Sequence, residues 1–264
     1  MDRDLLRALL PALVSAHLPR NARNFHYQVY DGTPHVSAFG LPVDPRSFQG
    51  KIIAKTDEAL VIKTGRISFA AVDRALASDD PAEGARVEVT PYARRRFDGL
   101  RADTPKEETQ RMADGRSYTV HTVTLGKNVT LPLPAPRCPE LAELIAQIEN
   151  LPAPDGFRRI ANLLVDAQAR NFYCVDPAQD HIIDTPPAIG FDVDTGKFSG
   201  RVGVLYDRTL DLYVVELRHG GDLVAREEQV DFSALGGTLE RLIDDGAWRR
   251  IRIILLDHAG KARH

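Results

Sequence analysis

The chain has 264 residues, of which 43% are hydrophobic and 27% are charged, a composition that is ordinary for a folded protein able to bury more than one core. Its 34 Lys and Arg against 37 Asp and Glu give a formal net charge of −3, which excludes a basic surface spread over the whole molecule. Any contact with nucleic acid therefore has to be local.

The sequence predicts neither export nor insertion into a membrane. No apolar run approaches the roughly 18 residues that a membrane-spanning helix needs, and the opening Met1-Asp2-Arg3-Asp4 lacks the basic region of a signal peptide. We therefore expect a cytoplasmic protein that contacts no membrane. Cys138 and Cys174 have no metal-binding spacing, so we expect both to be reduced thiols.

The N-terminal region predicts a helix followed by a hairpin. Asp2 is a plausible N-cap, and leucine and valine recur at helical spacing down to Leu18. Pro11 interrupts this pattern and is expected to bend or divide the helix. Alternating residues at 25–29, an Asp31-Gly32 turn and residues 35–39 then predict two strands.

Residues 48–92 contain four short runs rich in Ile and Val, which predict four strands. The runs cover residues 50–55, 59–63, 67–72 and 86–90, with turn residues between them. Four such strands within one short stretch predict a small, curled antiparallel barrel-like module.

The same stretch resembles the KfrB-type domain found in proteins of bacterial plasmids and integrative conjugative elements. The matching motifs are Gly50-Lys-Ile-Ile-Ala-Lys-Thr-Asp, Gly65-Arg66 opening a strand, Val72-Asp-Arg-Ala-Leu76, and Gly84 with Val87 and Val89. The resemblance covers under a fifth of the chain. It implies an accessory protein of a mobile element.

The remainder predicts a loop, a strand, a connector and a second domain. Residues 98–115 are polar without an apolar period and are expected to form a mobile loop, and residues 117–125 a strand. Four prolines lie in residues 131–139, which predicts a stiff connector. A helical pair follows, in which Pro139 opens the first helix and Asp155 caps the second, and then a three-stranded meander, a helix and a last strand at 251–256.

These elements predict an α+β fold of two domains. The N-terminal β-rich domain covers residues 1–131 and includes the barrel-like module at 48–92. The Pro-rich connector covers residues 132–139, and the C-terminal domain, a helical pair with a β-meander and a helix, covers residues 140–264.

The sequence carries no strong catalytic motif. Asp192 and Asp194 resemble an acidic strand-end motif of phosphotransferases, but carboxylates before a glycine are more typical of a β-turn, and we assign Asp244-Asp245-Gly246 in the same way. The eight histidines have no metal-binding spacing, and no nucleophile elbow or phosphate-binding glycine loop occurs. We therefore expect no cofactor, no metal and no catalytic residue.

One basic cluster is candidate nucleic-acid-binding chemistry. Arginine beside aromatic residues on a small barrel is typical of proteins that bind single strands by phosphate contact and base stacking. The alternative is a solvated strand edge on which cations prevent aggregation. Arg249, Arg250 and Arg252 near Trp248 form a second, weaker cluster. The predicted site residues are Tyr92, Arg94, Arg95, Arg96, Phe97, Lys51, Lys63 and Arg66, with Lys55 beside them.

Three functions remain open from the sequence. The first is a non-enzymatic accessory protein of a plasmid or integrative element that contacts nucleic acid. The second is a protein-directed inhibitor or adaptor, such as an anti-defence factor. The third is a metal-assisted hydrolase that uses the acidic residues near Asp192. The sequence does not determine the oligomeric state.

Overall fold

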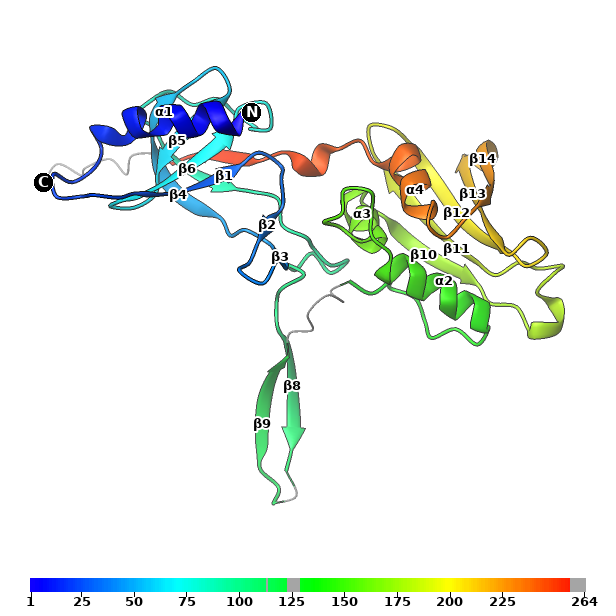
Figure 1. Cartoon of the computed structure of the whole chain (residues 1–264). Helices are drawn as coiled ribbons and strands as arrows, with labels where there is room; N and C mark the ends of the chain where they lie inside the picture. The colour runs from blue at the N-terminus through cyan, green and yellow to red at the C-terminus, as the bar shows by residue number, and fades with distance from the viewer. Residues whose placement is uncertain (113, 123–128, 257–264) are drawn as a thin grey trace, which may run out of the picture. The chain divides into compact units, whose positions relative to one another are not determined.

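The computed structural model describes residues 1–112, 114–122 and 129–256 and has an α+β fold in two compact units (Figure 1). Unit 1 comprises Met1–Ala93 and Trp248–His264, and unit 2 comprises Arg94–Ala247. The boundary between the units thus differs from the one expected at residues 132–139. The Pro-rich segment belongs to unit 2 because Leu131 and Cys138, at its ends, are buried in the core of that unit.

Unit 1 is built on a six-stranded sheet in the order β1-β6-β5-β4-β7-β15. The four strands expected between Phe48 and Tyr92 are present, and all neighbours are antiparallel except the parallel pair β1 and β6. Among the described residues no ladder joins β1 to β15, so the sheet is not closed into the expected barrel. The strands are β1 (His26–Tyr30), β4 (Phe48–Lys55), β5 (Ala59–Lys63), β6 (Ser68–Asp73), β7 (Arg86–Thr90) and β15 (Arg252–Leu255).

Helix α1 (Arg3–Ser15) covers one face of this sheet. Asp2 is its N-cap, because Oδ1 accepts from the backbone N–H of Asp4 at 2.9 Å and of Leu5 at 3.0 Å. The helix is not divided at Pro11, since the buried side chains of Leu10 and Val14 on either side of it pack against the same face. The other face holds a second core that contains Ile52, Leu60, Ile62, Val87, Val89 and Ile253.

Unit 2 is built on a five-stranded antiparallel sheet in the order β10-β11-β12-β13-β14. The three α-helices that the structure describes in this unit pack against the apolar face of the sheet, and α2 and α3 contact each other as expected. The elements are α2 (Pro139–Asn150), α3 (Ile160–Asp166), β10 (Arg170–Val175), β11 (Ala188–Asp194), β12 (Ser199–Asp207), β13 (Leu212–His219), β14 (Asp222–Val230) and α4 (Leu235–Ile243), with 3-10 turns at Gln179–His181 and Ala247–Arg249.

Two expectations for the C-terminal half were wrong. The last strand, β15, does not join the meander but pairs with β7 in unit 1, because Ile251 and Ile253 are buried in the unit 1 core. Asp155 does not cap α3, which begins at Ile160. Its Oδ1 instead accepts from the backbone N–H of Phe157 at 2.8 Å and of Arg158 at 2.7 Å in the preceding turn.

Two small antiparallel ribbons complete the fold. In unit 1, β2 (His35–Val36) pairs with β3 (Pro42–Val43). In unit 2, β8 (Lys106–Arg111) pairs with β9 (Ser117–Thr122), so a strand lies within residues 98–115, where only a loop was expected. Residues 123–125 of the strand expected at 117–125 lie outside the described residues. No described helix combines the length and the apolar character that crossing a membrane requires.

Candidate nucleic-acid interface

Three cationic side chains of unit 1 lie in register across three neighbouring strands. Lys51 on β4 is directly opposite Lys63 on β5 on one side and Arg86 on β7 on the other. Adjacent strands are about 4.8 Å apart, so the three backbone positions fall within about 10 Å of one another. We call Lys63, Lys51 and Arg86 the cationic row.

A glycine positions the row. A Cβ at Gly50 would lie 2.5 Å from Ile62 Cγ2 and 2.6 Å from the Lys63 carbonyl oxygen, closer than side chains approach one another. Glycine therefore lets β4 approach β5 closely at the residue before Lys51. The steric need for glycine at position 50 therefore accompanies the placement of Lys51 opposite Lys63.

The row lies on the sheet face that α1 partly covers. Its register continues from Lys63 to Phe69 on β6 and Tyr27 on β1, and directly opposite residues of a sheet share a face. The Lys63 ammonium donates to the His17 carbonyl oxygen at 2.5 Å, just after the end of α1. Lys51 and Arg86 are exposed, so the row borders solvent where the helix ends.

Within the described part of the chain, the cations of the row have no carboxylate partner. Among the described residues, neither Lys51 nor Arg86 has an ion pair or a side-chain hydrogen bond, and the same holds for the exposed Arg66 after β5. The acidic residue on the same strand face, Glu88, accepts a hydrogen bond from the Gln49 amide at 3.0 Å. Like charges directly opposite each other destabilise a sheet. A bound anion would remove this repulsion.

Two other cations of unit 1, Lys55 and Arg74, share a carboxylate partner. Lys55 lies 2.9 Å and Arg74 2.7 Å from the Asp80 carboxylate. The pKa of Asp80 is lowered, most of all by its hydrogen bond from Arg74 and next by that from Lys55. The two cations are therefore already paired with a carboxylate. These two residues provide a natural comparison for the row.

The two units differ strongly in charge. Unit 1 has 16 Lys and Arg against 12 Asp and Glu, a formal net charge of +4. Unit 2 has 18 against 25, a net charge of −7. The whole-chain net charge of −3 is therefore the sum of a basic unit 1 and an acidic unit 2. Only the net charge of unit 1 favours binding of a polyanion.

The structure divides the site residues predicted from sequence between the two units. Lys51, Lys63, Arg66 and Tyr92 belong to unit 1, whereas Arg94, Arg95, Arg96 and Phe97 belong to unit 2.

The three consecutive arginines each have a local contact. The Arg94 guanidinium carbon lies 4.5 Å from the centre of the Phe157 ring, and Arg95 donates to the Gly99 carbonyl oxygen at 2.9 Å. Arg96 lies 3.1 Å from the Asp98 carboxylate. Their adjacency in sequence therefore does not amount to a shared cationic patch.

The aromatic residues beside them contact other rings of their own units. Tyr92 packs edge-on against Trp248 with ring centres 4.7 Å apart, and the Arg249 guanidinium lies 5.1 Å from the Trp248 ring centre. Phe97 packs edge-on against Phe172 at 5.0 Å and belongs to the margin of the unit 2 core. These contacts favour packing over base stacking.

Replacing Phe97 with Ala is expected to destabilise unit 2 by about 2 kcal/mol, because it removes a partly buried ring and its edge-on contact with Phe172. Urea unfolding measures this loss. Oligonucleotide affinity of the folded variant should be unchanged. A variant of unchanged stability that loses affinity would instead support base stacking by Phe97.

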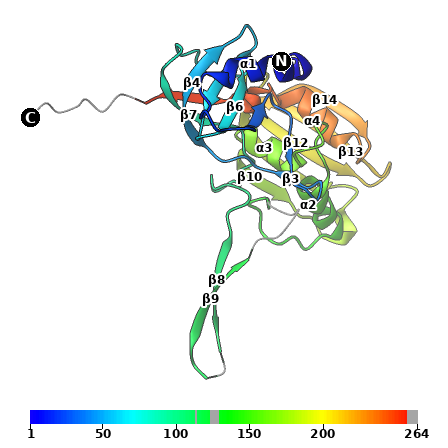
Figure 2. The ribbon, with the colours of Figure 1, turned by 60° about the vertical axis from the view of Figure 1, so that its left-hand side comes forward.

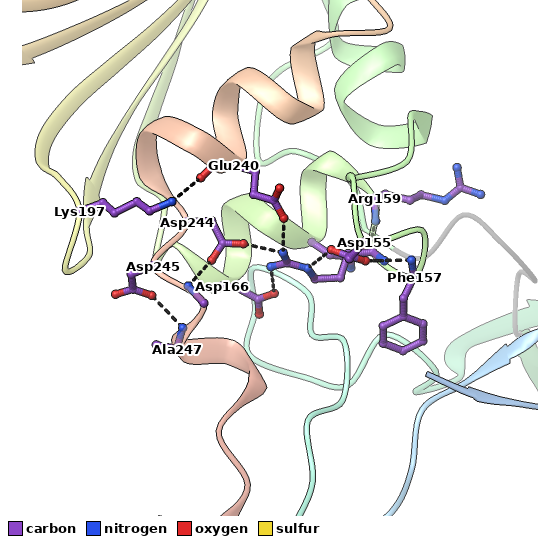
Figure 3. Close-up of polar contacts among 12 residues, drawn as sticks. Asp155, Phe157, Arg159, Asp166, Lys197, Glu240, Asp244, Asp245 and Ala247 are labelled. Atoms are coloured by element: carbon purple, nitrogen blue, oxygen red, sulfur yellow. Dashed lines mark hydrogen bonds and ion pairs between the residues drawn. The ribbon is translucent and has the colours of Figure 1, made fainter. Parts of the chain in front are cut away.

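Unit 2 contains a buried charge cluster that resembles an active site but is fully paired (Figure 3). The Arg158 side chain is 0% exposed, and its guanidinium lies 2.8 Å from Asp155, 2.9 Å from Asp166 and 2.5 Å from Asp244. Glu240 lies at 4.0 Å. The carboxylates raise the pKa of Arg158 despite its burial, so it stays charged and cannot act as a base. The cluster joins the turn before α3 to the ends of α3 and α4.

The sequence predicted a turn at Asp192 and Asp194. In the structure these two residues instead lie at the end of strand β11. Asp192 accepts from the Asn171 amide at 2.9 Å and from Arg201 at 3.0 Å. The pKa of Asp192 is lowered, most of all by its hydrogen bond from the Asn171 amide and to a smaller extent by Arg201. Across the part of the chain that the structure describes, no three His, Cys, Asp or Glu side chains are arranged to hold a metal ion.

Comparison of the chain with protein-family models, with curated proteins and with solved structures found no match. Of the residues predicted from the sequence, Lys51 and Lys63 lie in the cationic row and Arg66 does not, whereas Arg86 of the row was not among the predicted residues. The usable signal was the alternation of Arg86-Val-Glu-Val, which places Arg86 and Glu88 on one face, and strand register was needed to place Arg86 beside Lys51.

Proposed function

We propose that the protein binds nucleic acid through the sugar-phosphate backbone, with the cationic row of unit 1 as the contact surface. The observation that carries the proposal is the in-register set Lys63, Lys51 and Arg86, in which no carboxylate alternates with the cations. Phosphate contacts of this kind give affinity without reading bases.

The surroundings of the row favour backbone contact over base stacking. Phe69, which continues the row, is only 3% exposed, and Tyr27 packs near Phe25 with ring centres 6.1 Å apart. An exposed ring would be needed to stack on a base. We therefore expect binding that depends little on nucleotide sequence.

The resemblance to the KfrB-type domain supports the same proposal. Its motifs include Gly50-Lys51 and Val87, which lie within or next to the row. In this proposal, strands β4 to β7 act as a small barrel-like binding module. The protein would be an accessory factor of a bacterial mobile element.

A protein-directed adaptor is the second candidate, favoured by the apolar ribbon β2–β3. Phe39 at its turn is 90% exposed, and Val36 and Leu41 are 65% and 51% exposed. Large apolar side chains that gather on one exposed turn are typical of interaction sites. This candidate is preferred if the cationic row proves to bind nothing.

The row is tested by fluorescence anisotropy with labelled single-stranded and duplex oligonucleotides. The variant K51Q/K63Q/R86Q is expected to bind roughly 100-fold more weakly at about 0.1 M salt, because three phosphate contacts are lost. Circular dichroism should confirm that it is folded, since Lys63 also bonds His17.

The matched control is K55Q/R74Q, which removes two cations from the same unit that are already paired with Asp80. Its affinity should fall by less than about threefold, because the Asp80 carboxylate already offsets the positive charge of both side chains. Equal losses in the two variants would point to net charge rather than to the row, and no loss in either would contradict the proposal.

A further inference from the structure

The ribbon formed by β8 and β9 has both faces in water. These two strands pair only with each other among the described residues, and Figure 2 draws them as a separate ribbon. Of the side chains described in the two strands, only Val120 is half-buried, and Tyr118 is 46% exposed. An isolated two-stranded ribbon is marginally stable, and three or more strands are needed for independent stability.

The two outer edges of the ribbon differ in chemistry. The outer strand edge of β8 carries Glu107, Glu108 and Arg111, and charged side chains oppose pairing with another strand. Strand β9 has the sequence Ser-Tyr-Thr-Val-His-Thr, which is rich in β-branched and aromatic residues and has His121 as its one titratable cation. The edge of β9 is therefore the one suited to a further strand.

We propose that β9 pairs antiparallel with β9 of a second copy of this chain, about a two-fold axis through Thr119. Residues that face each other in an antiparallel pair lie on the same face of the sheet. The two-fold axis must therefore run midway between one residue and the same residue of the second copy, here Thr119. An axis at Thr119 places Tyr118 opposite Val120 of the second copy, and Ser117 opposite His121.

This register suits the side chains. It forms the aromatic and β-branched pair Tyr118–Val120 twice by symmetry, a favourable cross-strand combination, and brings no like charges together. An axis at Val120 would instead place Tyr118 opposite Thr122 and lose this pair. The product is a four-stranded sheet in the order β8-β9-β9-β8. It has more than the three strands that a sheet needs for independent stability, whereas the lone ribbon has only two.

Cysteine cross-linking tests the register. In the proposed dimer the two Thr119 residues face each other at the separation that a disulfide spans, so T119C should form a covalent dimer under mild oxidation. Thr109 is directly opposite Thr119 in the same ribbon, but the two copies of Thr109 would be about 14 Å apart, so T109C should stay monomeric. Wild type reports any background from Cys138 and Cys174.

Sedimentation tests the association without a covalent bond. Wild type and T109K should sediment as dimers, and T119K as a monomer, because the latter places two ammonium groups directly opposite each other. Monomeric wild type at the highest concentration reached would overturn the proposal. So would a T119K dimer as stable as wild type, or equal cross-linking of T119C and T109C. Neither readout depends on nucleic-acid binding.

Discussion

Replacing Arg158 with leucine is expected to destabilise unit 2 by about 3–5 kcal/mol, the usual cost of removing one partner from a buried ion cluster. The side chain is 0% exposed, and Asp155, Asp166 and Asp244 all lie within 2.9 Å of its guanidinium. Leucine would leave three poorly solvated carboxylates without a cation. It would also separate the turn before α3 from the ends of α3 and α4.

The matched control is Arg241→Leu in the same unit. The Arg241 and Glu227 side chains are 58% and 40% exposed and lie 3.2 Å apart, so their pair should contribute less than about 1 kcal/mol. Urea unfolding measures both variants, and hydrogen exchange of α3 and α4 peptides localises the effect to unit 2. Similar small losses in both variants would contradict a structural role for the Arg158 cluster.

Local patterns predicted the local elements well. The period of leucines after Asp2 gave helix α1, and the alternation within residues 48–92 gave strands β4 to β7, because in each case one face is buried. Strand β8 was not predicted, because this signal is absent from it. Its residues 107–111 are exposed on both faces, so no apolar period marks the strand.

The boundary between the units was beyond local reasoning. The pairing of Ile253 with Val89 joins residues that are far apart in sequence, and only the packing of Ile251 and Ile253 in unit 1 shows it. Proline content indicated a stiff segment at 132–139, but stiffness does not imply exposure. Leu131 and Cys138 are 6% and 3% exposed within unit 2.

The candidate site shows the same limit. Composition singled out Arg94, Arg95 and Arg96 because they are adjacent in sequence, yet each has its own contact in unit 2. The row instead gathers residues from three strands, and sequence separation hides their proximity. Strand register, rather than sequence clustering, brings Arg86 to Lys51.

The salt dependence of binding is expected to be steep for wild type and shallow for the row variant K51Q/K63Q/R86Q. Each phosphate contact contributes a slope of about −0.7 on single strands and −0.9 on duplex DNA in a plot of log affinity against log salt concentration. Three contacts therefore give slopes of about −2.1 and −2.7. On single strands, affinity should fall about 20-fold between roughly 50 and 200 mM salt.

The most direct test is thus a salt titration of wild type, the row variant and the control K55Q/R74Q on one single strand and one duplex. We expect the row variant to have a slope shallower by about two units on single strands, whereas the control keeps the wild-type slope. Equal slopes for wild type and the row variant, or no wild-type binding even at low salt, would contradict the assignment of Lys51, Lys63 and Arg86 as the nucleic-acid contact.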